Sequence, residues 1–258
     1  MAIEVFNRHE NKYLIDENTY ESMCARLSDY MELESYNRER ETYSICNVYY
    51  DTDDDYLIRT SIKKPRYKEK LRLRSYGTPN IDSEVYVEIK KKICGFVNKR
   101  RSALRLDEAY EFLNTTLLPE THPEQNRQVL KEIKYILEQH NLEPKLYLAY
   151  ERRAYFDAID HDLRISFDTD IITRRNDIAL ESGIYGEKLL KDGKRIMEIK
   201  TSKNIPLWLT QLLSEYKIYP TSFSKYGKEY INYISSRNFI QKTMYIFKPE
   251  SSGMFLSS

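Results

Sequence analysis

Alternation of charged and apolar side chains marks several segments of this chain, and a period of two is typical of β-strands with one polar and one apolar face. In the run from Lys70 to Arg74, every cation falls on one face and every leucine on the other. Residues 84–92 repeat the pattern, with polar and aromatic side chains opposite two valines and an isoleucine. We therefore predict strands whose charge lies on a single face.

The rest of the chain predicts further strands and several amphipathic helices. An antiparallel meander fits residues 67–106, because turn signals at 77–80 and 94–95 separate three strand-like runs. In residues 124–140, apolar residues recur at helical spacing. Strands are predicted at 5–15, 44–50, 67–76, 84–92, 96–106, 146–157, 163–172, 195–201 and near 222. Helices are predicted at 18–33, 107–118, 124–140, 206–217 and 228–237, and a short helical turn is predicted to begin at 53–55.

Strands with one charged and one apolar face can close into a barrel whose outside packs on helices and whose inside stays polar. The fold class predicted is α+β, an antiparallel β-barrel tunnel of about eight strands surrounded by α-helices. Residues 1–240 are expected to form this single domain, and residues 241–258 a loose C-terminal tail.

Charge and glycine content exclude two kinds of site, a nucleic-acid-binding surface and a glycine-rich phosphate loop. The 258 residues include 41 Lys plus Arg against 40 Asp plus Glu, so the chain has no overall basic field and no nucleic-acid partner is expected. Only 7 glycines occur, and both glycine-rich phosphate-loop motifs are absent, so side chains must hold any phosphate. The chain has no run of about twenty apolar residues, and its start is rich in charge. We expect a cytoplasmic protein with no membrane span in this chain.

The charged strand faces are candidates for a phosphate site. A charged face usually points into water, where ion pairs contribute only a few tenths of a kcal/mol. Arginine is prominent here, however, and its planar group binds phosphate oxygens in pairs. Cations crowded inside a barrel cost several kcal/mol each when they lose solvent, and a polyanion between them removes that cost. Glu-x-Lys recurs on three predicted strands, at Glu10/Lys12, Glu88/Lys90 and Glu198/Lys200, which favours one shared interior.

Seven short motifs follow one another along the chain: R-x-E-x-K-Y at 8–13, K-L-R-L-R at 70–74, V-E-I-K at 87–90, Y-x-R-x-A-x-F at 150–156, R-I-S-F-D-T at 164–169, M-E-I-K at 197–200 and S-K-Y at 224–226. From Arg8 to about Tyr230, these motifs and their order resemble the VTC polyphosphate polymerase domain, a branch of the CYTH or triphosphate tunnel metalloenzyme superfamily.

The resemblance implies a tunnel in which basic side chains hold the triphosphate of ATP and a growing chain of inorganic polyphosphate. It also implies a glutamate that binds Mn²⁺ or Mg²⁺, and this glutamate is Glu198. By motif, the phosphate ligands that act in catalysis are Lys12, Arg72, Arg74, Lys90, Lys99, Arg152, Arg164 and Lys225, and the further substrate-binding residues are Tyr150, Ser224, Lys200 and Arg101.

Three functions stay open at this point. The first is an ATP:polyphosphate phosphotransferase, the second is an inorganic tri- or polyphosphatase with the same tunnel, and the third is a polyphosphate-binding module without catalysis. Glu10 and Glu88 are interpreted as charge-balancing partners of nearby lysines, with a second metal ion as the alternative. The sequence leaves a membrane-protein partner open.

Overall fold

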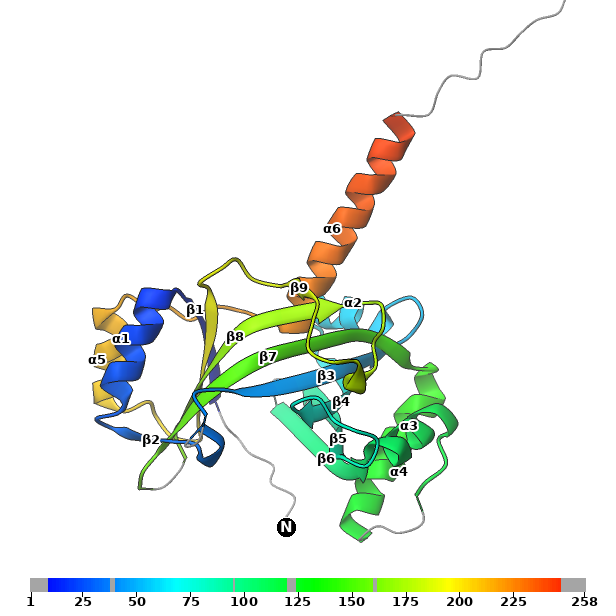
Figure 1. The fold of residues 1–258 in the computed structure, drawn as a ribbon, viewed down its shortest axis with the longest axis horizontal. Coiled ribbons are helices and arrows are strands. Elements are labelled where there is room, and N and C mark those ends of the chain that lie inside the picture. The colour runs from blue at the N-terminus through cyan, green and yellow to red at the C-terminus, as the bar shows by residue number, and fades with distance from the viewer. Residues whose placement is uncertain (1–8, 38–39, 95, 120–123, 160–161, 247–258) are drawn as a thin grey trace, which may run out of the picture.

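One curled antiparallel sheet forms the centre of the computed structural model, which describes residues 9–37, 40–94, 96–119, 124–159 and 162–246 (Figure 1). Eight strands follow one another in the order β1-β10-β8-β7-β3-β4-β5-β6, while β2 pairs with β7 and β9 with β8. The strands are β1 (His9–Ile15), β2 (Met31–Leu33), β3 (Tyr43–Asp51), β4 (Tyr67–Tyr76), β5 (Glu84–Ile93), β6 (Phe96–Arg105), β7 (Glu143–Asp157), β8 (Arg164–Arg174), β9 (Glu187–Lys188) and β10 (Arg195–Thr201).

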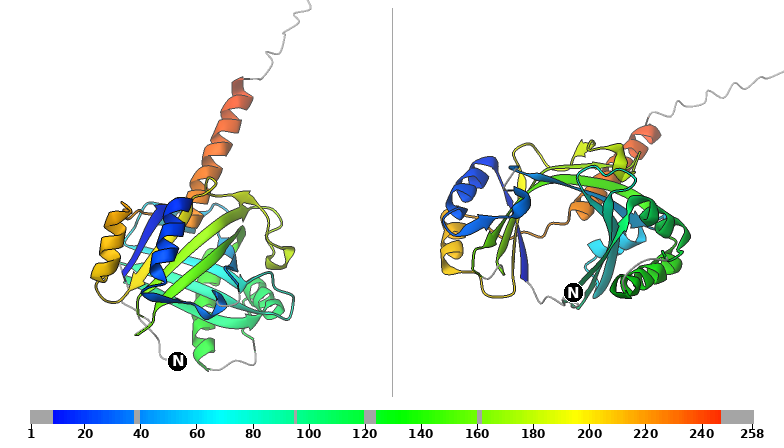
Figure 2. Two further views of the ribbon diagram at one scale, coloured as in Figure 1. Left: turned by 60° about the vertical axis from the view of Figure 1, so that its left-hand side comes forward. Right: turned by 60° about the horizontal axis from the view of Figure 1, so that its bottom comes forward.

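The predicted architecture of about eight antiparallel strands with helices outside is confirmed, and Figure 2 shows how far the sheet curls. The barrel is not closed, however. Within the described ranges, β1 and β6 are the two ends of the sheet and do not pair with each other, so the sheet is a half-barrel. The strand predicted near Ser222 is reduced to one bridge between Thr221 and Lys12, because helix α6 begins only four residues later at Lys225.

Helices cover the convex face of the sheet. Figure 1 places α1 and α5 together beside β1 and β10, and α3 and α4 beside β6. None of the helices within the described ranges has an apolar stretch long enough to cross a membrane. The α-helices are α1 (Glu17–Leu27), α2 (Tyr56–Ile62), α3 (Leu106–Thr115), α4 (Glu124–His140), α5 (Leu207–Glu215) and α6 (Lys225–Ile246), with 3-10 turns η1 (Ser35–Asn37) and η2 (Leu180–Ser182).

Several predicted helix boundaries differ from the structure. Helix α1, predicted from residue 18, begins at Glu17, because the Asp16 side chain caps it by accepting a hydrogen bond from the Thr19 amide. This helix stops at Leu27, and residues 31–33, predicted as helix, form β2 because they pair with β7. Helix α6 continues to Ile246, into the segment predicted as a tail.

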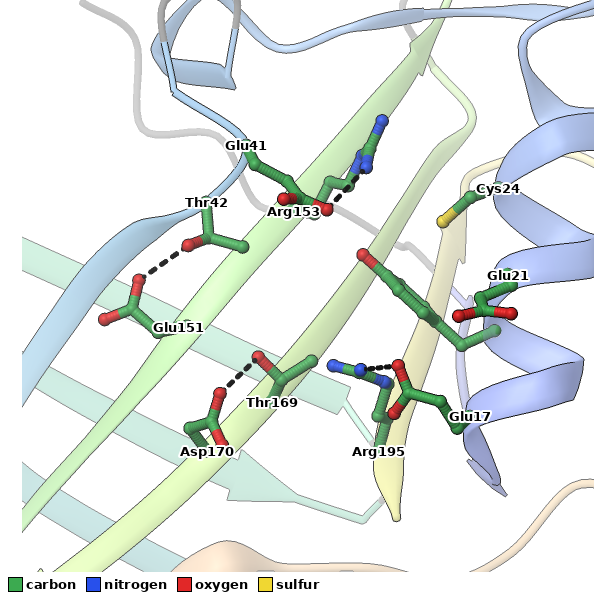
Figure 3. A pocket seen from close by; sticks show the side chains of 11 residues that line it. Glu17, Glu21, Cys24, Glu41, Thr42, Glu151, Arg153, Thr169, Asp170 and Arg195 are labelled. Carbon is green, nitrogen blue, oxygen red and sulfur yellow. Dashed lines mark hydrogen bonds and ion pairs between the residues drawn. The ribbon is translucent and has the colours of Figure 1, made fainter. Parts of the chain in front are cut away.

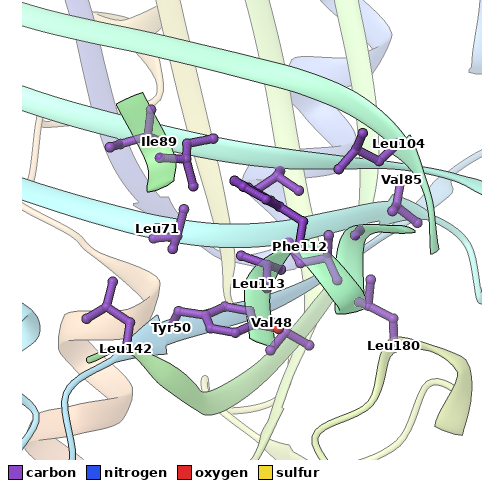
Figure 4. Close-up of a cluster of buried hydrophobic side chains, with 14 of the residues drawn as sticks. Val48, Tyr50, Leu71, Val85, Ile89, Leu104, Phe112, Leu113, Leu142 and Leu180 are labelled. Carbon is purple, nitrogen blue, oxygen red and sulfur yellow. The ribbon is translucent and has the colours of Figure 1, made fainter. Parts of the chain in front are cut away.

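Two hydrophobic clusters lie between the sheet and its covering helices. The first joins β3 to β6 with α3 and α4, and Figure 4 shows Phe112 of α3 among the side chains of the sheet. The second joins β1, β7, β8 and β10 with α1 and α5 around Met23 and Phe167. Each fully buried side chain of this size contributes about 1.5–3 kcal/mol. These clusters fix which face of every strand is left for the concave side.

A third cluster fills part of the concave side itself. It includes Ile45 and Ile196 from the sheet, Ile58 from α2 and Tyr226 from α6. Ile196 lies two positions before Glu198 on β10, so apolar and charged residues share the same strand face. The concave face therefore carries an apolar region, around Ile58 of α2 and Tyr226 of α6, next to its charged residues.

Candidate functional site

Strand register gathers the cations of β4, β5 and β6 into rows on the concave face. Lys70 is paired with Lys90, which is paired in turn with Lys99. One step along the strands, Glu88 lies between Arg72 and Arg101. Because directly paired residues point to the same side of an antiparallel sheet, these residues face one interior.

The opposite wall is built in the same way from β1, β10, β8 and β7. Lys12 is paired with Glu198, Lys200 with Arg164, and Arg152 with Asp168. Ser224 and Lys225 reach the site from the segment that leads into α6: the Ser224 hydroxyl lies 3.2 Å from Lys70 Nζ, and Lys225 contacts Asp168. The structure thus brings all thirteen sequence-predicted site residues to one face: Lys12, Arg72, Arg74, Lys90, Lys99, Arg101, Tyr150, Arg152, Arg164, Glu198, Lys200, Ser224 and Lys225.

Glu88 anchors the cations of the β4–β6 wall. Its side chain is only 2 % exposed. One carboxylate oxygen accepts a hydrogen bond from Arg72 Nε at 2.7 Å and lies 3.8 Å from Arg74 Nε, and the other lies 2.9 Å from Lys99 Nζ. Burial works against the charged carboxylate, but these three cations outweigh it and hold the pKa of Glu88 far below its usual range. Glu88 thus balances charge on this wall.

Asp168 has the same role on the opposite wall. The carboxylate is fully buried and accepts two hydrogen bonds from Arg152, at 2.6 Å and 2.8 Å, and a third from Lys225. Despite burial, these partners lower the pKa of Asp168. Sequence reasoning did not assign Asp168 to the site, although it shares the alternating face of Arg164, and that alternation was the available signal.

Glu198 lies on β10, beside the start of α6. Lys12 and Lys200 lie 3.3 Å and 3.1 Å from its oxygens, and Lys225 and Arg152 lie at 3.8 Å and 3.9 Å. These cations lower the pKa of Glu198 well below its usual value in spite of its burial. Among the described residues, no group of three His, Cys, Asp or Glu side chains forms a metal cage.

For the lysines paired across β4, β5 and β6, the cost of burying a charge exceeds the attraction of nearby acidic groups. Burial and the neighbouring cations lower the pKa of Lys70 to about 8 and that of Lys99 to about 7, and they also lower the pKa of Lys90. The pKa of Lys12, which contacts two carboxylates, is raised instead. Lys70 was not assigned from the sequence, although it belongs to the same alternating run as Arg72.

Positive charge exceeds negative charge on this face by a wide margin. Among the described residues, five carboxylates, those of Glu10, Glu34, Glu88, Asp168 and Glu198, lie among the cations. The eleven basic residues are Lys12, Lys70, Arg72, Arg74, Lys90, Lys99, Arg101, Arg152, Arg164, Lys200 and Lys225. A ligand with several negative charges would restore the balance.

Further side chains, most of them neutral, hold the arginines in fixed directions. Arg74 donates to Asn47 Oδ1 at 3.0 Å and lies 3.5 Å from the Tyr150 hydroxyl, and Arg72 lies 3.3 Å from the Tyr49 hydroxyl. Arg164, at the edge of the face, is held by Glu34 at 2.9 Å. Arginines fixed in this way are preorganised for phosphate oxygens, because little side-chain entropy remains to be lost.

A separate pocket of about 490 Å³ lies on the convex side, beside α1. Figure 3 shows its lining, in which five carboxylates surround only two guanidinium groups. Both arginines already have acidic partners, Arg153 with Glu41 and Arg195 with Glu17. This pocket repels phosphate, so the candidate site for a polyanion is the concave face.

Comparison with known proteins agrees with the fold. The model of the VTC domain family matches residues 7–232. Subunit 4 of the vacuolar transporter chaperone complex is 26 % identical over 217 residues in Trypanosoma brucei brucei, covering 69 % of this chain and 27 % of that protein. The Schizosaccharomyces pombe subunit 4 is 22 % identical over 265 residues, covering 86 % and 36 %. The chain therefore spans about a quarter to a third of the length of these relatives.

A solved structure from Bacillus halodurans, described as a candidate adenylate cyclase, has the same fold. It superposes with a TM-score of 0.52 at 15 % identity, covering 83 % of this chain and 92 % of that one. At this identity the likeness concerns the fold alone.

Proposed function

This chain belongs to the VTC domain family, and from that premise we propose that it transfers the γ-phosphoryl group of ATP to a growing chain of inorganic polyphosphate. The observation that carries the proposal is the excess of eleven basic residues over five carboxylates among the described residues of one concave face. Such a face matches a linear polyanion, whose charge repeats along its length as the rows of basic residues do along the strands.

The arginines and lysines stabilise the charge that spreads over the transferred phosphoryl group. Arg72 and Arg74 point from the β4 wall, Arg152 from the opposite wall and Lys225 from the start of α6, so a phosphate chain between them is contacted from two sides. Glu88 and Asp168 hold these cations in place before substrate binds. The reaction needs no nucleophile from the protein, because the end of the acceptor chain attacks.

We assign Glu198 to a divalent ion that takes most of its ligands from substrate, because Mg²⁺ is usually held by one or two carboxylates together with substrate phosphates. Lysines contact both oxygens of Glu198, so the ion would share the carboxylate with them. Bound Mn²⁺ or Mg²⁺ would neutralise phosphate charge and align the leaving diphosphate. Lys12 and Lys200 hold the carboxylate in position for this role.

A gel assay tests the proposal directly. Purified protein is incubated with ATP and Mn²⁺, and the products are separated on a polyphosphate gel. A ladder of lengthening chains is expected. Orthophosphate alone would show the tri- or polyphosphatase instead, and phosphate-chain binding without turnover would show a module without catalysis.

Substitution of the β4 arginines tests the site. Arg72→Ala or Arg74→Ala is expected to lower the rate about 10²- to 10³-fold, the usual effect of deleting one electrostatic contact to a transition state. Arg105→Ala is the matched control, because Arg105 is 52 % exposed and pairs with Asp82 and Asp107 at the far end of β6. Circular dichroism verifies the fold. Wild-type rates in both β4 variants would remove these residues from the site.

A further inference from the structure

Four tyrosines gather at one end of the concave face, and we call them the tyrosine rim: Tyr36, Tyr43, Tyr76 and Tyr86. Tyr36 and Tyr76 are stacked, with ring centroids 5.8 Å apart and planes 6° apart. Tyr43 lies against both, at 5.5 Å and 6.1 Å, and Tyr86 meets Tyr76 edge-on at 5.9 Å. The rings come from η1, β3, β4 and β5, which are well separated along the chain.

Exposure sets this cluster apart from a core. Tyr36 is 59 % and Tyr76 is 41 % exposed, so two parallel rings keep much of their surface in water. Large aromatic surface is costly to leave in water, and an exposed aromatic patch beside a polar site commonly serves binding.

The rim continues the line of cations on β4. Lys70, Arg72, Arg74 and Tyr76 occupy alternate positions on one face of this strand. At about 3.4 Å per residue, Tyr76 lies about 7 Å along the strand from Arg74 and about 14 Å from Arg72. Tyr86 is paired directly with Arg74. Aromatic surface thus begins beside Arg74, the last β4 cation, and extends about 7 Å beyond it along the strand.

Cations also join the rim itself. The Arg101 guanidinium lies over the Tyr86 ring, 4.6 Å from its centroid, and Arg164 Nη2 lies 3.4 Å from the Tyr43 hydroxyl. Glu34, which accepts hydrogen bonds from Arg164 and from the Tyr43 hydroxyl, places acceptor oxygens beside the rings. A ligand at the rim meets a flat apolar surface, positive charge and carboxylate acceptors together.

We propose that the tyrosine rim is the nucleoside subsite, where the base of the nucleotide stacks against the Tyr36–Tyr76 pair while its phosphates run along β4 from Arg74 towards Lys70. This inference rests on the proposed function, since it assumes a nucleoside triphosphate as the phosphoryl donor. It also fixes polarity: the nucleoside lies at the rim, and the γ-phosphate lies deeper, towards the three-lysine row of Lys70, Lys90 and Lys99. Because aromatic stacking tolerates every base, the rim selects a nucleoside without selecting its base.

Binding measurements with two ligands test the subsite. Dissociation constants for ATP and for inorganic triphosphate are measured by calorimetry without divalent ions, in the wild type and in a Tyr36→Ala/Tyr76→Ala variant. We expect the variant to bind ATP roughly 5- to 150-fold more weakly, the loss typical of removing an aromatic ring from beneath a base. Triphosphate binding is expected to stay within about twofold, because the cations are untouched. Tyr36→Phe/Tyr76→Phe keeps the rings and is expected to bind ATP as the wild type does.

Tyr30→Ala is the matched control. Tyr30 is 41 % exposed, as Tyr76 is, and stacks on Trp208 at 4.3 Å and 2°, but on the convex side beside α5. It is expected to leave both affinities unchanged. Unchanged ATP binding in the double alanine variant would overturn the subsite, as would an equal loss for both ligands, which would mark the rings as structural. Wild-type protein that binds neither ligand would refute the proposed function itself.

Discussion

Glu88→Gln tests whether Glu88 stabilises the fold by balancing the charge of the cations around it. The substitution keeps the shape of the side chain and removes its charge, leaving Arg72, Arg74 and Lys99 without their shared partner. With an effective dielectric constant of about 20, each attraction at these separations of 2.7–3.8 Å amounts to about 4–6 kcal/mol before desolvation. The net cost of breaking a buried pair is smaller, about 3–5 kcal/mol. We therefore expect the melting temperature to fall by about 6–20 °C.

Thermal and urea denaturation measure this loss. Glu84→Gln is the control on the same strand, since Glu84 is exposed and contacts the Tyr86 hydroxyl, and it is expected to change stability by less than about 0.5 kcal/mol. Added triphosphate is expected to stabilise Glu88→Gln more than the wild type, because the ligand replaces the missing negative charge. A variant as stable as the wild type, or one that triphosphate fails to stabilise, would refute the reasoning.

The loss of stability in Glu88→Gln is expected to become smaller as the pH falls. The folded-state pKa of Glu88 is lowered, so its contribution to stability is present above the ordinary carboxyl pKa of 4.5 and is lost as the pH falls below that value. The stability gap between wild type and Glu88→Gln is therefore expected to be full at pH 7 and to narrow below about pH 4.5. A gap that stays constant with pH would mean that the carboxylate charge is not its cause.

Three further results are expected. Polyphosphate binding should take up protons at pH 8 and weaken as the pH rises from 7 to 9, because the pKa values of Lys70 and Lys99, about 8 and about 7, rise beside a polyanion. Calorimetry in two buffers of different ionisation enthalpy measures this proton uptake. Absence of the uptake would contradict the charge argument. Glu198→Gln should abolish the effect of Mn²⁺ on ATP binding while triphosphate still binds without metal, and an unchanged metal response in a titration would remove Glu198 as the ligand. Gly186→Ala should destabilise the fold by about 1–3 kcal/mol, because Gly186 has φ +151° and the added Cβ would lie 2.5 Å from the Thr173 carbonyl oxygen. Urea titration measures this loss. An unfolding midpoint equal to that of the wild type would contradict the steric argument.

Local pattern predicted the strands well and some boundaries poorly. Residues 67–76 and 195–201 were predicted with the bounds that the structure has, because alternation of charge is strong there. Residues 31–33 were predicted as helix, since the helical pattern of α1 gives no local stop before them. Their pairing with β7, more than a hundred residues later, decided their conformation.

The chain by itself determined which side chains share a face, because that depends only on the period of two within each strand. Local alternation together with the family motifs therefore sufficed to nominate Lys12, Arg72 and Glu198. Tertiary structure alone decided the register that lines up Lys70, Lys90 and Lys99, and the approach of Lys225 to Asp168. It also decided that the sheet stays a half-barrel and that the tyrosine rim forms. These features join residues far apart in sequence, and long-range packing, which local periodicity does not encode, fixes their positions.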